Sequence, residues 1–271
     1  MLSDKSSVPG FVYRYLVDAF LDRLQERLER LETTQPIAAV SPRIRRDDAH
    51  AVIKYVTATL LEARPGFSAT PSLTELTATA VEGLVFGRLY DVVFEEIVAE
   101  SAGRDNALRD KIQWFRDGNT SRTNEPISSE SLEALRQLPQ AHSVADKLFY
   151  CVQFLERISD FFASAGTSSA GPCADSLLKL ACQHILAADL SAMNAEIAFL
   201  EEFARDEELL RGREGYALVT LQASLHFLNL STDFETDIFG QDDEEDNVPV
   251  AAAWDEQQED DITSSDDPVL D

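Results

Sequence analysis

Cysteine, basic residues and long apolar runs are all scarce in this sequence. The three cysteines, Cys151, Cys173 and Cys182, are an odd number without CxxC spacing, which argues against a disulfide framework or a zinc site and fits a reducing compartment. All three lie in apolar stretches, where a free cysteine usually behaves as a small hydrophobe. No apolar run approaches the roughly 18 residues that cross a bilayer, and residues 1–10 lack the apolar core of a secretory signal. We therefore expect a cytoplasmic protein without a transmembrane segment.

Positive charge is also scarce and unevenly placed. The chain has 23 Lys and Arg against 49 Asp and Glu, a net charge of −26. Residues 233–271 hold sixteen of the acids and no Lys or Arg, so the rest of the chain carries −10. Such a chain is repelled by nucleic acid and by anionic membrane surfaces, and we expect neither as a partner. Its field favours encounter with a partner that exposes Lys or Arg.

Motifs for metal, nucleotide and covalent chemistry are missing. The four histidines, at positions 50, 142, 184 and 226, have no HExxH or other close ligand spacing, so we expect no metal site. The sequence contains no GxxxxGK[ST] loop, no GxGxxG loop and no GxSxG elbow. We therefore expect no cofactor and no enzyme chemistry in which a covalent bond is made or broken.

The sequence reads as all-α. Apolar residues recur at three- and four-residue steps, and no segment alternates with period two between turn signals. The predicted helices cover residues 11–32, 47–63, 72–101 (interrupted near Gly83 or Gly87), 105–115, about 128–138, 144–163, 174–188, 191–204 and 214–230. Together they predict a bundle of nine or ten helices.

Three regions are expected along the chain. Residues 1–79 are predicted to form an N-terminal helical bundle, which packs on a second helical domain at residues 80–230. Beyond about Ser231 the apolar periodicity fades and acidic residues dominate, so residues 231–271 are predicted to be a disordered tail. The tail either keeps the chain soluble, folds back on a basic surface, or binds a basic or trafficking-adaptor partner, for which Phe234, Phe239 and Trp254 among the acids are a weak motif.

Several segments resemble the vacuolar protein sorting nine domain, the exchange module of Rabex- and Varp-like proteins. The resemblance is carried by residues 84–97 with the helix after them, by AHSVADKLFYCVQFLERI at 141–158, by residues 173–204 beginning CADSLLKLACQHI, and by GREGYALVTLQASLHFL at 212–228. Together these elements cover about residues 80–230 in the family's order. The resemblance implies a guanine-nucleotide exchange factor for an early-endosomal Rab GTPase, peripheral on early endosomes. It assigns Asn194 and Phe199 to packing or to fixing a helix, not to partner contact.

Asp175 is similar to the family's catalytic aspartate, an acidic finger. A Rab holds GDP through its P-loop lysine and Mg²⁺. A carboxylate inserted there would compete for the lysine, repel the β-phosphate and disfavour Mg²⁺, so that the nucleotide leaves. The alternative role of Asp175 is an ordinary first-turn residue that stabilises a helix N-terminus.

Tyr216 is similar to the family's tyrosine that contacts the GTPase switch region. The resemblance implies that Leu218, Leu221 and Leu225 line an apolar groove beside it; the alternative is a semi-buried core tyrosine. Two positions depart from the family pattern: Lys179 stands where relatives usually have Pro, and Val219 where they usually have Thr, with Thr220 next. An Asp175–Lys179 pair on one helix is worth only about 0.2–0.5 kcal/mol, so Lys179 need not silence Asp175.

Three hypotheses therefore stay open. The first is an active exchange factor, which uses Asp175 and contacts its partner through Tyr216, Leu218, Val219, Thr220 and Lys179. The second is an exchange-dead adaptor that binds a Rab or a trafficking complex, which Lys179 and Val219 favour. The third is an unrelated helical scaffold.

Overall fold

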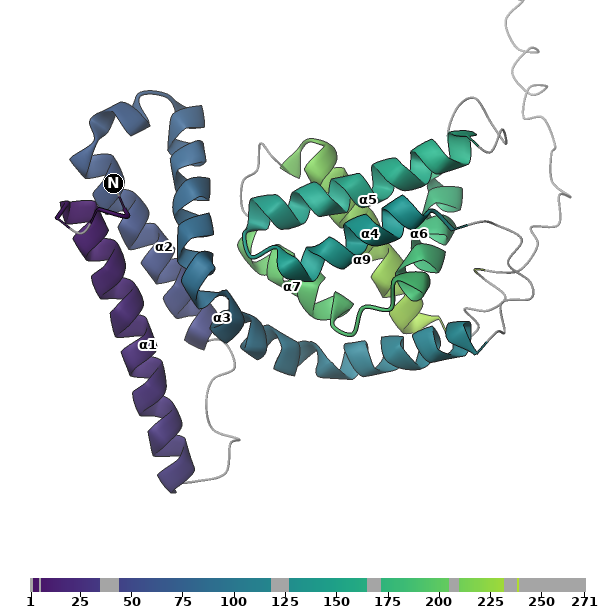
Figure 1. Cartoon of the computed structure of the whole chain (residues 1–271), viewed down its shortest axis with the longest axis horizontal. Coiled ribbons are helices and arrows are strands. Elements are labelled where there is room, and N and C mark those ends of the chain that lie inside the picture. Colours follow the sequence, from purple (N-terminus) through teal and green to yellow (C-terminus); the bar gives the residue numbers. More distant parts are fainter. Residues whose placement is uncertain are drawn as a thin grey trace, which may run out of the picture. The chain divides into compact units, whose positions relative to one another are not determined.

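The computed structural model describes residues 2–4, 6–34, 44–117, 127–164, 172–204, 210–231 and 238, which lie in one compact unit of residues 1–239. In these ranges the chain forms eight α-helices and no strand, which confirms the all-α prediction. The helices are α1 (Val8–Thr34), α2 (Ile44–Ala63), α3 (Pro71–Arg116), α4 (Ser129–Gln137), α5 (Val144–Ser164), α6 (Ala174–Ala188), α7 (Met193–Phe203) and α9 (Arg213–Leu230) (Figure 1). Short 3₁₀ turns, η2 (Pro65–Ser68) and η3 (Leu138–Gln140), precede α3 and follow α4. The predicted tail, 231–271, lies outside the described residues apart from Ser231 and Ile238.

Helix α3 shows that the sequence prediction of separate helices in this region was wrong. Instead of two or three helices it is a single one of 46 residues, capped at its start by Thr70, whose side chain accepts a hydrogen bond from the Leu73 backbone N–H. The glycines at positions 83 and 87 do not interrupt it. Each glycine costs a helix about 1 kcal/mol, and that cost is exceeded by the burial of their neighbours Val85, Phe86 and Leu89. This merging explains why eight helices replace the nine or ten expected.

The first half of α3 packs with α1 and α2, and the three lie side by side in Figure 1. Their shared core contains Val17 and Phe20 of α1 with Val52 and Val56 of α2. The Tyr13 hydroxyl donates to the Leu84 carbonyl across 2.9 Å. These contacts hold the N-terminal helices against the middle of α3.

Helix α3 also packs against α5, α6, α7 and α9, and among these four α7 is its main neighbour. The joint core is rich in aromatic rings: Phe86 of α3 meets Phe199 and Phe203 of α7 edge-on at centroid distances of 4.9 and 4.8 Å. Phe199 is fully buried, which confirms its predicted packing role. The long helix α3 is therefore shared by the N-terminal helices and the C-terminal group.

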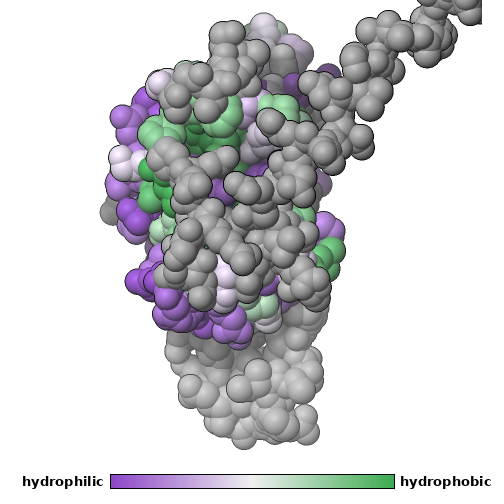
Figure 2. Space-filling view, turned by 90° about the vertical axis from the view of Figure 1, so that its right-hand side faces the viewer, coloured by the Kyte–Doolittle hydropathy of each residue, from purple (hydrophilic) through white to green (hydrophobic). Residues whose placement is uncertain are grey.

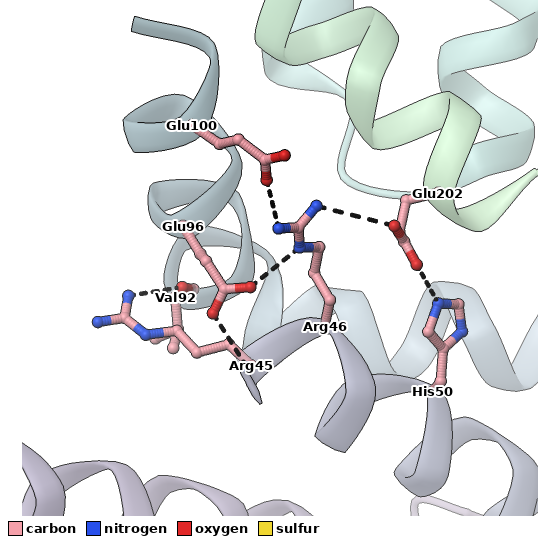
Figure 3. A network of polar contacts seen from close by, with 7 residues as sticks. All are labelled: Arg45, Arg46, His50, Val92, Glu96, Glu100 and Glu202. Atoms are coloured by element: carbon pink, nitrogen blue, oxygen red, sulfur yellow. Dashed lines mark hydrogen bonds and ion pairs between the residues drawn. The ribbon is translucent and has the colours of Figure 1, made fainter. Parts of the chain in front are cut away.

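A polar network joins α2 to both α3 and α7 (Figure 3). The Arg46 guanidinium, 5% exposed, donates to Glu96 at 2.9 Å and to Glu100, and lies 3.8 Å from Glu202 of α7. Glu202 also bonds His50 at 2.9 Å. Because acids of α3 and α7 surround this one arginine of α2, ion pairs as well as apolar packing hold α2 in place relative to α7.

The predicted boundary between residues 79 and 80 falls inside α3, which runs through it without a break. The helices on either side of that position are joined by packing and by the Arg46 network. The division into an N-terminal helical bundle at residues 1–79 and a second domain at residues 80–230 stays a prediction.

Candidate functional site

Helix α6 carries Asp175 and Lys179. It begins after Pro172 with Cys173 as its N-cap residue, and Asp175 lies in its first turn, where a negative charge suits the helix dipole. The Asp175 side chain is exposed and that of Lys179 is half-buried. The other face of α6 packs Leu177 and Leu180 into the core. The buried face fixes the helix, so the carboxylate of Asp175 projects from a rigid support.

Cys173 departs from expectation, because it is exposed while Cys151 and Cys182 are buried as predicted. Its Sγ lies 3.1 Å from the Ser176 Oγ. Hydrogen bonds from the Ser176 side chain and backbone lower the pKa of this thiol. Apolar periodicity missed its exposure because Cys173 precedes the first buried turn of α6.

Helix α9 carries the predicted partner-contacting residues. It starts after Gly212, and a Cβ at Gly215 would meet the Leu210 carbonyl oxygen at 1.8 Å. Only glycine therefore lets the chain before α9 pass so close to its first turn. This close passage lies in the first turn of α9, one residue before Tyr216.

The structure divides the predicted contact residues of α9 between surface and core. Tyr216 is 57% exposed and Val219 62%, whereas Leu218 is 6% exposed and packs inside. The Thr220 hydroxyl donates to the Tyr216 carbonyl at 2.8 Å. Leu221 is fully buried, so in this structure Leu218 and Leu221 do not line an open groove; a role of Leu218 toward a partner stays a prediction.

Helices α6 and α9 pack directly against each other. The Cys182 thiol of α6 reaches the Ser224 carbonyl of α9 at 3.6 Å. The two helices therefore present Asp175 and Tyr216, both exposed, from one packed pair. Figure 2 shows the side on which α6 lies in Figure 1; its described surface has a green, apolar area near the top, a smaller one at the right edge, and purple, hydrophilic residues around them.

Buried polar contacts hold the helices beneath this surface. Lys147 of α5 is fully buried, pairs with Glu196 of α7 and donates to the Leu138 carbonyl at 2.9 Å. Burial lowers the pKa of Lys147 and raises that of Glu196, while each charge favours the other. Asn194, predicted to fix a helix, does so: its backbone N–H donates to Asp105 at 2.8 Å, and its side-chain oxygen accepts from Asn229 at 2.7 Å.

His184 joins α6 to the start of α4. Its Nδ1 lies 2.7 Å from the Leu180 carbonyl and its Nε2 accepts from the Ser128 backbone N–H at 3.0 Å. These partners require the neutral ring with the proton on Nδ1. Burial lowers the pKa of His184 further.

A hollow of about 590 Å³ lies between α7 and α9, and sequence reasoning missed it. Two residues singled out from the sequence line it: Val219, a predicted contact residue, and Leu225, predicted to line an apolar groove. The other lining residues are Arg104 of α3 and residues of α7 and α9. The available signal was the spacing of Tyr216, Val219, Ala223, His226 and Leu230 along one stripe of α9, at three- and four-residue steps.

Residues 129–232 match the family model of the Vacuolar sorting protein 9 (VPS9) domain. This range includes α4 to α9 and every predicted site residue, so this part of the chain is a VPS9 domain, as the resemblance implied. VPS9 domains are generally exchange domains for Rab GTPases. A comparison with curated proteins finds no match for the chain.

Among the described residues no helix is both long and apolar enough to span a membrane. In the same ranges no group of three or more His, Cys, Asp or Glu is placed to hold a metal ion.

Proposed function

We propose that this chain is a guanine-nucleotide exchange factor for a Rab GTPase of the early-endosomal, Rab-five class, acting from the cytoplasm on early endosomes. The observation that carries the proposal is the exposure of Asp175 and Tyr216 on two packed helices within the VPS9 domain. The exposed carboxylate on α6 can enter a partner, and the exposed ring on α9 offers apolar area for a switch region.

Asp175 acts as an acidic finger in this proposal. Its carboxylate forms a charge-assisted hydrogen bond with the P-loop lysine of the GTPase, worth about 1.5–3 kcal/mol. The same charge repels the β-phosphate and disfavours Mg²⁺. The lysine bond is fully available only when GDP has left, and the repulsion acts only while GDP is bound. Both therefore favour the nucleotide-free state and speed release.

The contact surface includes Tyr216, Val219 and Thr220, with Lys179 on the neighbouring helix. Thr220 has its hydroxyl proton committed to the Tyr216 carbonyl, so toward a partner it offers an acceptor rather than a donor. Val219 offers only apolar surface. Lys179 places a cation one helical turn from Asp175, which disfavours a basic partner residue there and narrows the choice of Rab.

A second candidate function is an exchange-dead adaptor that binds a Rab or a trafficking complex. The Lys179 and Val219 departures favour it, because both change the surface next to the finger. An acidic tail that binds a basic or trafficking-adaptor partner suits either function.

Release of a fluorescent GDP analogue from a panel of Rabs tests the proposal. The proteins compared are the wild type, Asp175→Ala, and Asp22→Ala as a matched control, since Asp22 is also exposed but lies on α1 outside the VPS9 domain. We expect the wild type and the control to accelerate release from an early-endosomal Rab and Asp175→Ala to lose this effect. Rab binding without acceleration in any protein would establish the adaptor instead.

A further inference from the structure

One stripe of α9 is exposed along the whole helix. It consists of Tyr216, Val219, Ala223, His226 and Leu230. In the described parts of the VPS9 domain, residues 129–164, 172–204 and 210–231, four large apolar side chains are exposed, and three of them, Tyr216, Val219 and Leu230, are on this stripe. The fourth, Phe149, is on α5. Scattered exposed apolar residues need no explanation, but a row on one helix face indicates a contact surface.

Beyond Tyr216 the stripe borders the hollow between α7 and α9. The apolar lining of the hollow comes from Ile197 of α7 and from Val219, Ala223, Leu225 and Leu230 of α9. Leu230 is 66% exposed at its edge, and Ala223 leaves space where a larger side chain would fill it. A hollow of this size accepts one or two large side chains of a partner.

The rim of the hollow carries a cation on a strongly acidic chain. Arg104 and the imidazole of His226 line it, together with Glu201, whose carboxylate accepts a hydrogen bond from the Gln222 amide at 3.1 Å. Across a chain of net charge −26, the Arg104 guanidinium beside an apolar hollow favours a partner segment with an apolar side chain next to an acidic one.

We propose that this hollow is a second anchor point for the GTPase and helps to select which Rab is bound. This inference rests on the proposed exchange function and extends it from the surface beside Asp175 to the α7–α9 side of the domain. The occupant is an apolar side chain of the GTPase, flanked by an Asp or Glu that faces Arg104.

Two observations favour the GTPase over other occupants. The stripe is continuous from Tyr216 to Leu230, and Val219 belongs both to the predicted GTPase contact and to the hollow. A second copy of this chain also has a net charge of −26 and would be repelled. An anionic membrane would be repelled likewise.

The test compares two leucines of equal exposure. Leu230 borders the hollow and Leu76 lies on the first half of α3, and each is 66% exposed. Leu230→Glu and Leu76→Glu therefore introduce the same charge with the same loss of apolar surface. Exchange is measured with the full chain over a range of GDP-loaded Rab concentrations, to separate kcat from KM, beside Asp175→Ala. Ala223→Trp, which fills the hollow, is a second variant, and thermal melting checks that each protein is folded.

We expect Leu230→Glu and Ala223→Trp to raise KM roughly tenfold with little change in kcat, and Leu76→Glu to behave as the wild type. Wild-type KM in Leu230→Glu and Ala223→Trp, with exchange still lost in Asp175→Ala, would overturn the second anchor and leave the exchange function standing. Neither binding nor exchange by the wild type with any Rab would remove both proposals.

Discussion

Arg46 of α2 and Glu202 of α7 face each other across 3.8 Å with side chains only 6% and 10% exposed. Arg46 lies outside the range that matches the VPS9 family model, and Glu202 lies inside it. Glu96 and Glu100 of α3 share the same guanidinium (Figure 3). The N-terminal helices are therefore coupled to the VPS9 domain by a buried charge network as well as by apolar contacts.

Arg46→Ala is expected to destabilise the fold by about 2–4 kcal/mol, because it leaves Glu96 and Glu202 without their cation in a poorly solvated site. Arg88→Ala is the matched control: Arg88 also pairs with an acid, Asp18 at 3.1 Å, but both side chains are largely exposed. That pair should be worth less than about 1 kcal/mol. Urea denaturation monitored by circular dichroism measures both, and equal losses would show that the network does not stabilise the fold.

The buried pair of Lys147 and Glu196 gives a second prediction. Lys147→Met leaves the Glu196 carboxylate buried without a cation and should cost about 3–5 kcal/mol. Adding Glu196→Gln removes the uncompensated charge, so the double variant should be more stable than Lys147→Met alone. Denaturant unfolding of the two variants decides the point: if the second substitution brings no recovery, Glu196 is not the group that Lys147 stabilises.

Much of the helical pattern was predictable from the sequence, because apolar residues at three- and four-residue steps mark buried faces. The predicted range 174–188 coincides with α6, and α5 and α9 differ by one residue at single ends. The failure at α3 has a physical cause: local signals such as Gly83 and Gly87 describe the backbone alone, whereas the helix is held by packing against two groups of helices. The Arg46 network joins positions more than a hundred residues apart, which no local pattern reveals.

The candidate site was predictable only in part. The resemblance picked out Asp175, Tyr216 and Val219, and the structure exposes all three. It also picked out Leu218, which is buried because it lies on the side of α9 that faces the core. The hollow between α7 and α9 depends on how those helices pack. In the sequence, only its α9 residues can be recognised, by their spacing along one face of the helix.

Two glycines in helices provide a matched pair for a third prediction. Gly215→Ala places a methyl group 1.8 Å from the Leu210 carbonyl oxygen, so the chain before α9 has to move. We expect a loss of about 1–3 kcal/mol. A Cβ at Gly87 in α3 meets nothing within 4 Å, so Gly87→Ala should stabilise the fold by about 0.4–1 kcal/mol through the unfolded state. Thermal melting should shift in opposite directions; stabilisation by Gly215→Ala would contradict the close passage.

The titration of Glu82 on α3 leads to a prediction of how the free energy of unfolding depends on pH. Its carboxyl group accepts a hydrogen bond from the Val144 backbone N–H at 3.0 Å, at the start of α5. Burial is the main cause that raises the pKa of Glu82 to about 7; the Val144 hydrogen bond opposes the rise and the charge of Asp146 adds to it. The folded chain therefore keeps a proton that the unfolded chain releases near the ordinary pKa of 4.5.

Between these two pKa values the folded state binds more protons than the unfolded state, so Glu82 makes stability fall as pH rises. Because at most one proton is involved, the unfolding free energy changes by at most about 1.4 kcal/mol per pH unit. Glu82→Gln keeps the acceptor for the Val144 N–H and removes the titration. The difference in unfolding free energy between this variant and the wild type, measured in urea from pH 5 to pH 8, should grow in favour of the variant up to about pH 7 and then level off. A constant difference over that range would mean that Glu82 titrates alike in the folded and unfolded chains, and that its place at the start of α5 is solvated.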